Sequence, residues 1–258
     1  MSTLVHAHLA SVTPTDTGVE QHSVVRTVVL HLLPGVLVLA IYLNTAPLAV
    51  ALGFPADFAK ALFGIPLAVI VFQLAFLLYQ GKQQSGQPAL RGIVLYREPM
   101  PLWQYVVFTV LIIGWNALVY APVANQTGPV LTRTLFFWLP AMFFAEPDYA
   151  QLARSTVLVI FLVQLVVLGA AAVVEELYFR GYLLPRIARF GWWAPLISTA
   201  LFAMYHLDVP WSFASVFVGC LPIALLTYWK RNVYLAVISH ALVNLIAQCV
   251  WMLPFLWQ

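Results

Sequence analysis

Charged side chains are scarce in this sequence. Only 8% of the 258 residues are Asp, Glu, Lys or Arg, against about a quarter in a typical soluble domain. Hydrophobic residues make up 63% of the chain, and its mean hydropathy is +0.92. This composition excludes a water-soluble globular protein. The net charge of +3 is small and its bearers are scattered along the chain, so we expect no binding of nucleic acid.

Cysteine is almost absent as well. The sequence holds two cysteines, Cys220 and Cys249, and both lie inside apolar runs. A disulfide framework and a CxxC metal or redox pair are therefore excluded. Each cysteine is most simply a small buried hydrophobic residue, and we expect the protein to need no cofactor.

Long apolar runs fill most of the chain. Seven of them approach the roughly 20 residues that a membrane-spanning helix needs. They cover residues 24–43, 60–79, 103–121, 155–174, 192–207, 212–229 and 233–257. An eighth stretch, 130–145, is shorter and contains Arg133 and Pro140. The pattern predicts an all-α, polytopic membrane helix bundle with seven or eight transmembrane helices.

The positions of the basic residues favour seven spans. Cytoplasmic loops of membrane proteins are enriched in Lys and Arg. With seven spans and a cytoplasmic N-terminus, three basic residues lie outside and the other nine lie inside. The inner nine are Arg26, Lys82, Arg91, Arg97, Arg180, Arg186, Arg189, Lys230 and Arg231. An eighth span would remove this asymmetry, so we predict an integral protein of the cell membrane with its N-terminus in the cytoplasm.

The chain divides into three parts. Residues 1–23 form a polar tail that contains His6, His8 and His22. It has no basic segment followed by an apolar one, which argues against a cleaved signal peptide. Its histidines have no partners at metal-ligand spacing, so we interpret it as a solvated cytoplasmic tail. Residues 24–154 hold the N-terminal membrane helices and loops, and residues 155–258 hold the C-terminal helices.

Ionisable groups inside membrane spans are costly, and they usually serve a function. Seven of the nine carboxylates fall in the tail or in loops, which leaves Glu175 and Glu176 at the inner end of the fourth run. Three histidines lie within apolar runs. For His31 we expect a packing or interfacial role. His206 and His240 are candidates for a site.

The two adjacent glutamates differ in their expected surroundings. Glu176 and Arg180 are spaced i, i+4 with the acid first, which is the favourable order for an ion pair on one helix face. Glu175 points about 100° away, toward the apolar face that holds Ala171 and Tyr178. A carboxylate there is a candidate general base. An arrangement in which both glutamates pair with Arg180 and hold the helix end explains these residues equally well.

Two further polar positions follow in the chain. His206 ends the segment that begins at Phe202, and His240 precedes Asn244 by four residues, so that these two side chains share one helix face. Unpaired polar groups cost free energy in lipid, so this cluster favours a functional site. Counted along the helices, His206 lies roughly 21 Å from Trp192, but Glu175 only roughly 8 Å from Arg180. The two residues therefore differ in expected depth in the membrane. For them to form one site, helix tilt or a late start of the fifth span must remove this difference.

These segments resemble the CAAX protease and bacteriocin-processing family of intramembrane proteases, which is also called CPBP or ABI and includes the Ras-converting CAAX protease. Its motifs are EExxxR, FxxxH and either HxxxN or HxxxD, in this order on successive helices. They stand here as Glu175 to Arg180, Phe202 to His206, and His240 to Asn244. The resemblance covers about residues 167–247.

The resemblance implies a glutamic endopeptidase that cleaves membrane-associated proteins or peptides near the cytoplasmic face of the bilayer. Glu175 would activate water with the help of His206, and His240 and Asn244 would stabilise the oxyanion. Glu176 and Arg180 would support the position of Glu175. Residues 155–258 would then form the catalytic core. Substrates of the family include prenylated CaaX tails, peptide precursors and sorting signals.

Two other functions compete with this one. Two histidines and a glutamate form a ligand set of catalytic zinc sites, although an HExxH pair is absent. A non-catalytic transporter or scaffold is the alternative from another class. A transporter typically shows an internal repeat, which we do not find. A scaffold would tend to lose a catalytic residue, and all four are present.

Overall fold

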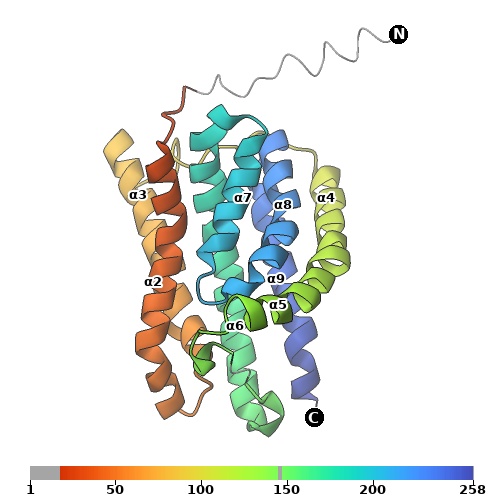
Figure 1. Cartoon of the computed structure of the whole chain (residues 1–258). Coiled ribbons are helices and arrows are strands. Elements are labelled where there is room, and N and C mark those ends of the chain that lie inside the picture. The colour runs from red at the N-terminus through yellow and green to blue at the C-terminus, as the bar shows by residue number, and fades with distance from the viewer. Residues whose placement is uncertain (1–17, 145–146, 258) are drawn as a thin grey trace.

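The computed structural model describes residues 18–144 and 147–257, and every regular element within these ranges is helical (Figure 1). The tail histidines His6 and His8 lie outside the described residues. The helical elements are α2 (Val24–Ala51), η1 (Lys60–Val71), α3 (Phe72–Ser85), α4 (Leu102–Trp115), η2 (Asn116–Tyr120), α5 (Ala121–Thr134), η3 (Ala141–Phe143), η4 (Tyr149–Gln151), α6 (Arg154–Glu175), η5 (Glu176–Leu183), η6 (Leu184–Phe190), α7 (Trp193–Tyr205), η7 (Pro210–Ser212), α8 (Phe213–Lys230) and α9 (Val233–Leu256).

Six helical runs are long and apolar enough to cross a membrane, which confirms the polytopic helix bundle. They are Val24–Ala51, Lys60–Ser85, Leu102–Thr134, Arg154–Phe190, Pro210–Lys230 and Val233–Leu256. The run at 192–207, predicted to be a span, is different. It forms α7, whose 13 residues fall short of a full crossing. The helix ends at Tyr205, since the backbone of His206 is no longer helical, and Pro210 begins the next helical turn.

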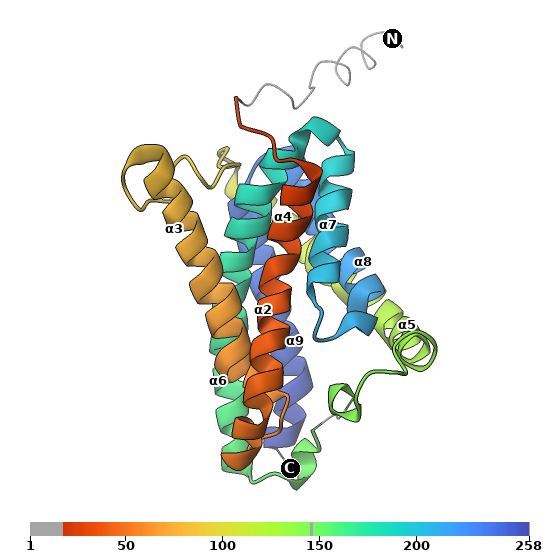
Figure 2. The same cartoon turned by 60° about the vertical axis from the view of Figure 1, so that its left-hand side comes forward.

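The eighth apolar stretch forms no separate span in the part of it that the structure describes. Its first residues, from Val130 to Thr134, are the end of a helix that runs unbroken from Leu102. This helix bends where the π-helical turn η2 and Pro122 lie between its two halves. As a result α5 turns away from α4 and lies across the bundle, where it contacts η7 and α8 (Figures 1 and 2).

The helix ends fall into two groups. The starts of α2, α4, α7 and α9 lie at the same end of the bundle as the ends of α3 and α8 (Figures 1 and 2). We call this end the N-terminal face. Helices α7 and α8 enter from it as a hairpin, and the connection between them turns back partway down the bundle. His206 lies on this connection, so the hairpin carries a polar side chain into the interior.

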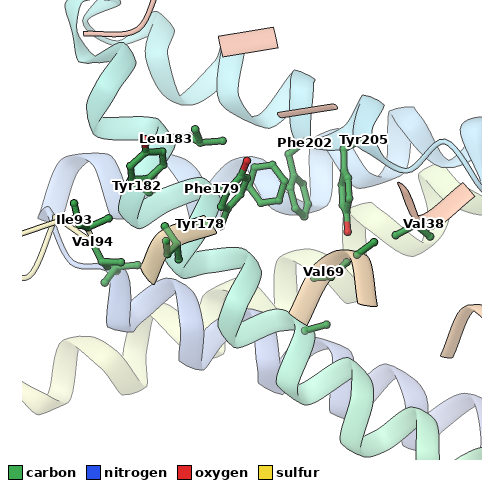
Figure 3. Close-up of a cluster of buried hydrophobic side chains, with 14 residues drawn as sticks. Val38, Val69, Ile93, Val94, Tyr178, Phe179, Tyr182, Leu183, Phe202 and Tyr205 are labelled. Carbon is green, nitrogen blue, oxygen red and sulfur yellow. The ribbon is translucent and has the colours of Figure 1, made fainter. Parts of the chain in front are cut away.

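Aromatic side chains pack η5 against α7. Phe179, Phe202 and Tyr205 lie side by side in the main hydrophobic cluster (Figure 3), with ring centroids 4.9–5.6 Å apart. Helix α2 packs closely against the same region. A Cβ atom on Gly35 would lie only 1.9 Å from the carbonyl oxygen of Tyr205, so only glycine permits this approach.

Candidate active site

Glu175 and Glu176 lie where the helix changes its winding. Glu175 is the last residue of α6, and Glu176 begins the π-helical segment η5. Such π turns inside longer helices often occur at functional sites. Both side chains are buried, with 7% of Glu175 and none of Glu176 exposed. Buried carboxylates need polar partners, and the two residues find different ones.

Glu176 lies between two basic side chains. Its Oε1 atom is 3.2 Å from Nη1 of Arg180, which confirms the predicted i, i+4 ion pair. The same oxygen accepts a hydrogen bond of 2.7 Å from Nδ1 of His240 on α9. The guanidinium of Arg180 also stacks on the ring of Phe202, 4.2 Å from its centroid. These buried contacts connect η5, which carries Glu176 and Arg180, with α9 and, through Arg180, with α7.

The topology prediction took Arg180 as a marker of the inner membrane edge. The structure shows that Arg180 does not lie at such an edge. Its side chain is fully buried, and the helical run continues beyond it to Phe190. Glu175 thus lies deeper than its distance from Arg180 along the helix indicates. The depth mismatch with His206 disappears, because Glu175 is in direct contact with Tyr205, the residue next to His206.

Tyr205 is a site residue that sequence reasoning missed. Its hydroxyl donates a hydrogen bond of 2.6 Å to Oε1 of Glu175, and both side chains are buried. The bond fixes one carboxylate oxygen of Glu175. The sequence did contain a signal for it: Tyr205 stands next to His206 within an apolar run, and a buried tyrosine hydroxyl usually has a polar partner.

His206 is positioned by the end of α7. Its Nδ1 atom donates to the carbonyl of Phe202 at 3.0 Å, since a carbonyl oxygen can only accept. This bond fixes the ring at the end of the helix and leaves Nε2 as its second polar atom. The chain then turns, and Asp208 on the same connection pairs with Lys60 at 3.2 Å. This ion pair joins the connection to the start of η1.

A cavity of about 820 Å³ collects the predicted catalytic residues. Glu175, His206, His240 and Asn244 all line it, as does Tyr205. Glu176 and Arg180 do not belong to its lining, but they contact the lining residues His240 and Phe202. Most of the remaining wall is apolar and comes from η2, α6, α8 and α9. Four residues predicted from three separate segments thus face one space.

His31 lies outside this cavity. It is fully buried in α2, where Nδ1 contacts the carbonyl of Thr27 at 2.8 Å and Nε2 lies 3.3 Å from the hydroxyl of Ser198. Both ring nitrogens therefore have partners. This arrangement agrees with the packing role expected for it.

The zinc alternative depends on a set of ligands close together in space. Within residues 18–144 and 147–257, no group of three His, Cys, Asp or Glu side chains is arranged to hold a metal ion. His206, His240 and Glu175 share the cavity without forming such a group.

Comparison with known proteins gives one match. Residues 155–246 match the family model described as type II CAAX prenyl endopeptidase, Rce1-like. No curated protein and no solved structure matches the chain. The matched segment contains Glu175, His206 and His240, and it supports a protease embedded in the membrane. The resemblance to the CAAX protease family that the three motifs indicate is thus confirmed for residues 155–246.

Proposed function

We propose that this protein is an intramembrane endopeptidase that uses a glutamate-activated water. One observation carries the proposal: Glu175, His206, His240 and Asn244 line a single cavity within an apolar helix bundle. Hydrophobic packing alone does not bring four such groups to one space, because each costs free energy when it lacks a polar partner. The match to the CAAX protease family supports the same class of reaction.

Glu175 is the proposed general base. It accepts a proton from a water molecule as the water oxygen forms a bond to the carbonyl carbon of the substrate. When the peptide C–N bond breaks, the protonated carboxyl returns this proton to the departing amine nitrogen. Tyr205 holds Oε1 of Glu175, so that Oε2 remains for the water. His206 is proposed to hold and polarise the same water.

His240 and Asn244 are the proposed donors to the oxyanion. They lie one turn apart on α9, and both line the cavity. Because Nδ1 of His240 already faces Glu176, the atom available to the oxyanion is Nε2. Donors fixed in this way contribute several kcal/mol to catalysis.

The proposed substrate is a membrane-associated protein or peptide. The wall around the polar residues is mostly apolar, and it suits an extended segment with apolar side chains better than a hydrophilic loop. The charge distribution supports a cytoplasmic N-terminus. Because the α7–α8 hairpin enters from the N-terminal face, we propose that cleavage occurs toward the cytoplasmic side.

The test compares peptides released in membranes of cells that produce either the wild-type protein or Glu175→Gln. New peptide ends that require Glu175 support the endopeptidase, and identical peptide profiles would contradict it. The purified protein is then given a substrate found in this way, with and without a zinc chelator. Unchanged cleavage supports the metal-free mechanism, whereas loss of cleavage that added zinc restores would favour the zinc enzyme.

A further inference from the structure

A second cavity lies at the N-terminal face, away from the proposed active site. It has a volume of about 570 Å³ and is bounded by the segment before α2, the end of α3, the loop after α3, and η5 with η6. We call it the arginine pocket. Its polar lining residues are Glu20, His22, Arg26, Gln80, Gln83, Gln84, Tyr182 and Arg186. None of them belongs to the cavity that contains Glu175.

The walls of the arginine pocket are held by specific hydrogen bonds. The side chain of Gln21 donates to the carbonyl of Pro185 at 3.1 Å and accepts from the backbone nitrogen of Arg189 at 3.1 Å. The backbone nitrogen of His22 donates to the carbonyl of Arg186 at 2.8 Å. The segment before α2 is therefore anchored to η6, and the pocket between them is a built feature of the fold.

Arg186 places a partly unpaired cation in the pocket. Only 9% of this residue is exposed. Its Nη1 atom donates to the carbonyls of Tyr182 at 2.7 Å and Ile93 at 3.3 Å. Its other guanidinium nitrogens have no hydrogen-bond partner among the described residues. These nitrogens are available for an anion.

The remaining polar groups also suit an anion. His22 is 2% exposed, and within residues 18–144 and 147–257 its Nδ1 atom has no hydrogen-bond partner. Burial, and after it the nearby cations Arg26 and Arg186, lower the pKa of His22 to about 3. Glu20 is the one carboxylate among the described lining residues, and it is largely exposed beside Arg26 at 3.6 Å.

We propose that the arginine pocket binds a phosphate group, supplied by the headgroup of an anionic lipid. Basic pockets between transmembrane helices on the cytoplasmic side are typical binding sites for such headgroups. The pocket lies at the N-terminal face, the end of the bundle where most basic residues gather. Guanidinium groups and side-chain amides are matched donors for phosphate oxygens. The proposal is independent of whether the protein cleaves peptides.

A general surface attraction is the competing explanation, because lysines and arginines attract anionic lipids wherever they lie on this face. The two explanations differ in which residues matter. If the lipid binds in the pocket, binding depends on Arg26 and Arg186 and is weakened by the negative charge of Glu20. If the lipid is attracted by the surface in general, Arg97, an exposed arginine outside the pocket, contributes as much to binding as Arg26 does.

The experiment measures binding of phosphatidylglycerol to the full-length protein in detergent micelles, with phosphatidylcholine as the neutral reference lipid. We expect saturable binding of phosphatidylglycerol that Arg26→Gln weakens about fivefold, whereas Arg97→Gln changes it little. Glu20→Gln should tighten binding, because it removes the one negative charge of the described lining. Arg186→Gln should weaken binding further, provided that its melting temperature shows an intact fold.

A second arm adds inorganic phosphate as a competitor. Displacement of the lipid at millimolar phosphate supports a site for phosphate from either source, whereas lipid binding that resists it supports the headgroup as the ligand. The proposal is overturned if neither phosphatidylglycerol nor phosphate binds. It is also overturned if Arg97→Gln weakens binding as much as Arg26→Gln, or if Glu20→Gln has no effect.

Discussion

At the scale of single residues, the central feature is the different surroundings of two adjacent glutamates. Glu176 forms a fully buried ion pair with Arg180 and accepts a hydrogen bond from His240. Glu175 faces the cavity and has one oxygen held by Tyr205. Removing one partner of a buried ion pair leaves an uncompensated charge, whereas a carboxylate at a cavity wall is free to exchange protons with water. Glu176 is thus suited to structure and Glu175 to chemistry.

The hydrogen bond between Tyr205 and Glu175 gives a residue-scale prediction. Tyr205→Phe should lower kcat by about 10- to 100-fold with little change in KM, because a hydrogen bond to a charged group contributes about 1.5–3 kcal/mol. The measurement is steady-state cleavage in liposomes. Tyr178→Phe is the matched control, since its hydroxyl donates to the carbonyl of Leu30 outside the cavity. Equal losses in both variants would contradict a specific role of Tyr205.

Much of this site could be predicted from spacing, because the i, i+4 relation fixes which side chains share a helix face. The Glu176–Arg180 pair is of this kind. The contacts from Tyr205 to Glu175 and from His240 to Glu176 join residues far apart in the sequence. They depend on how α7 and α9 pack against α6, which local spacing does not contain.

At the scale of elements, the short helix α7 positions the site. It begins at the N-terminal face and ends at Tyr205. The connection that follows it carries His206 and Asp208. The Lys60–Asp208 ion pair anchors this connection to η1, and the carbonyl of Tyr205 packs against α2 at Gly35. Two elements outside residues 155–246 therefore hold the end of α7 in place.

The close approach at Gly35 gives an element-scale prediction. Gly35→Ala would place a Cβ atom against the Tyr205 carbonyl and force α2 and α7 apart. We expect a loss of about 1–3 kcal/mol in stability, with a lower rate of cleavage because Tyr205 and His206 shift. Thermal unfolding in detergent and the cleavage rate are the measurements.

Gly114→Ala is the matched control for this substitution. Gly114 also lies in a helix, and a Cβ atom there meets no heavy atom within 4 Å. This variant should keep its activity and its melting temperature. A Gly35→Ala protein that behaves like Gly114→Ala would contradict the packing of α2 on α7.

Element positions were predictable, but the length of α7 was not. All seven apolar runs coincide with helices of the structure, because hydrophobicity over about 20 residues is a strong local signal. The run at 192–207 is as apolar as a span, yet α7 ends at Tyr205. Hydropathy cannot distinguish a crossing helix from half of a buried hairpin, since both are surrounded by apolar side chains.

At the scale of the whole molecule, the N-terminal face gathers the basic loops. Lys82, Arg97 and Arg189 lie near helix ends at this face, as do Lys230 and Arg231 at the end of α8. The opposite end carries the C-terminus and the start of α6 (Figures 1 and 2). By the positive-inside rule, we propose that the N-terminal face is oriented toward the cytoplasm.

This orientation is tested by labelling single cysteines with a membrane-impermeant thiol reagent in intact cells. Gln151→Cys, in η4 before α6, should react in intact cells. Gln87→Cys, in the loop after α3, should react only after permeabilisation. Both positions are exposed, and the unsubstituted chain gives the background from Cys220 and Cys249. The reverse pattern would contradict the cytoplasmic N-terminus.

The central claim is that Glu175 performs the chemistry while Glu176 maintains the structure. Its most direct test measures cleavage rate and melting temperature together for Glu175→Gln and Glu176→Gln in liposomes. Glu175→Gln should lose at least about 100-fold in rate and keep its melting temperature. Glu176→Gln should instead lose about 3–5 kcal/mol of stability, because Arg180 and His240 lose a buried partner. A Glu175→Gln protein that cleaves at the wild-type rate would contradict the account.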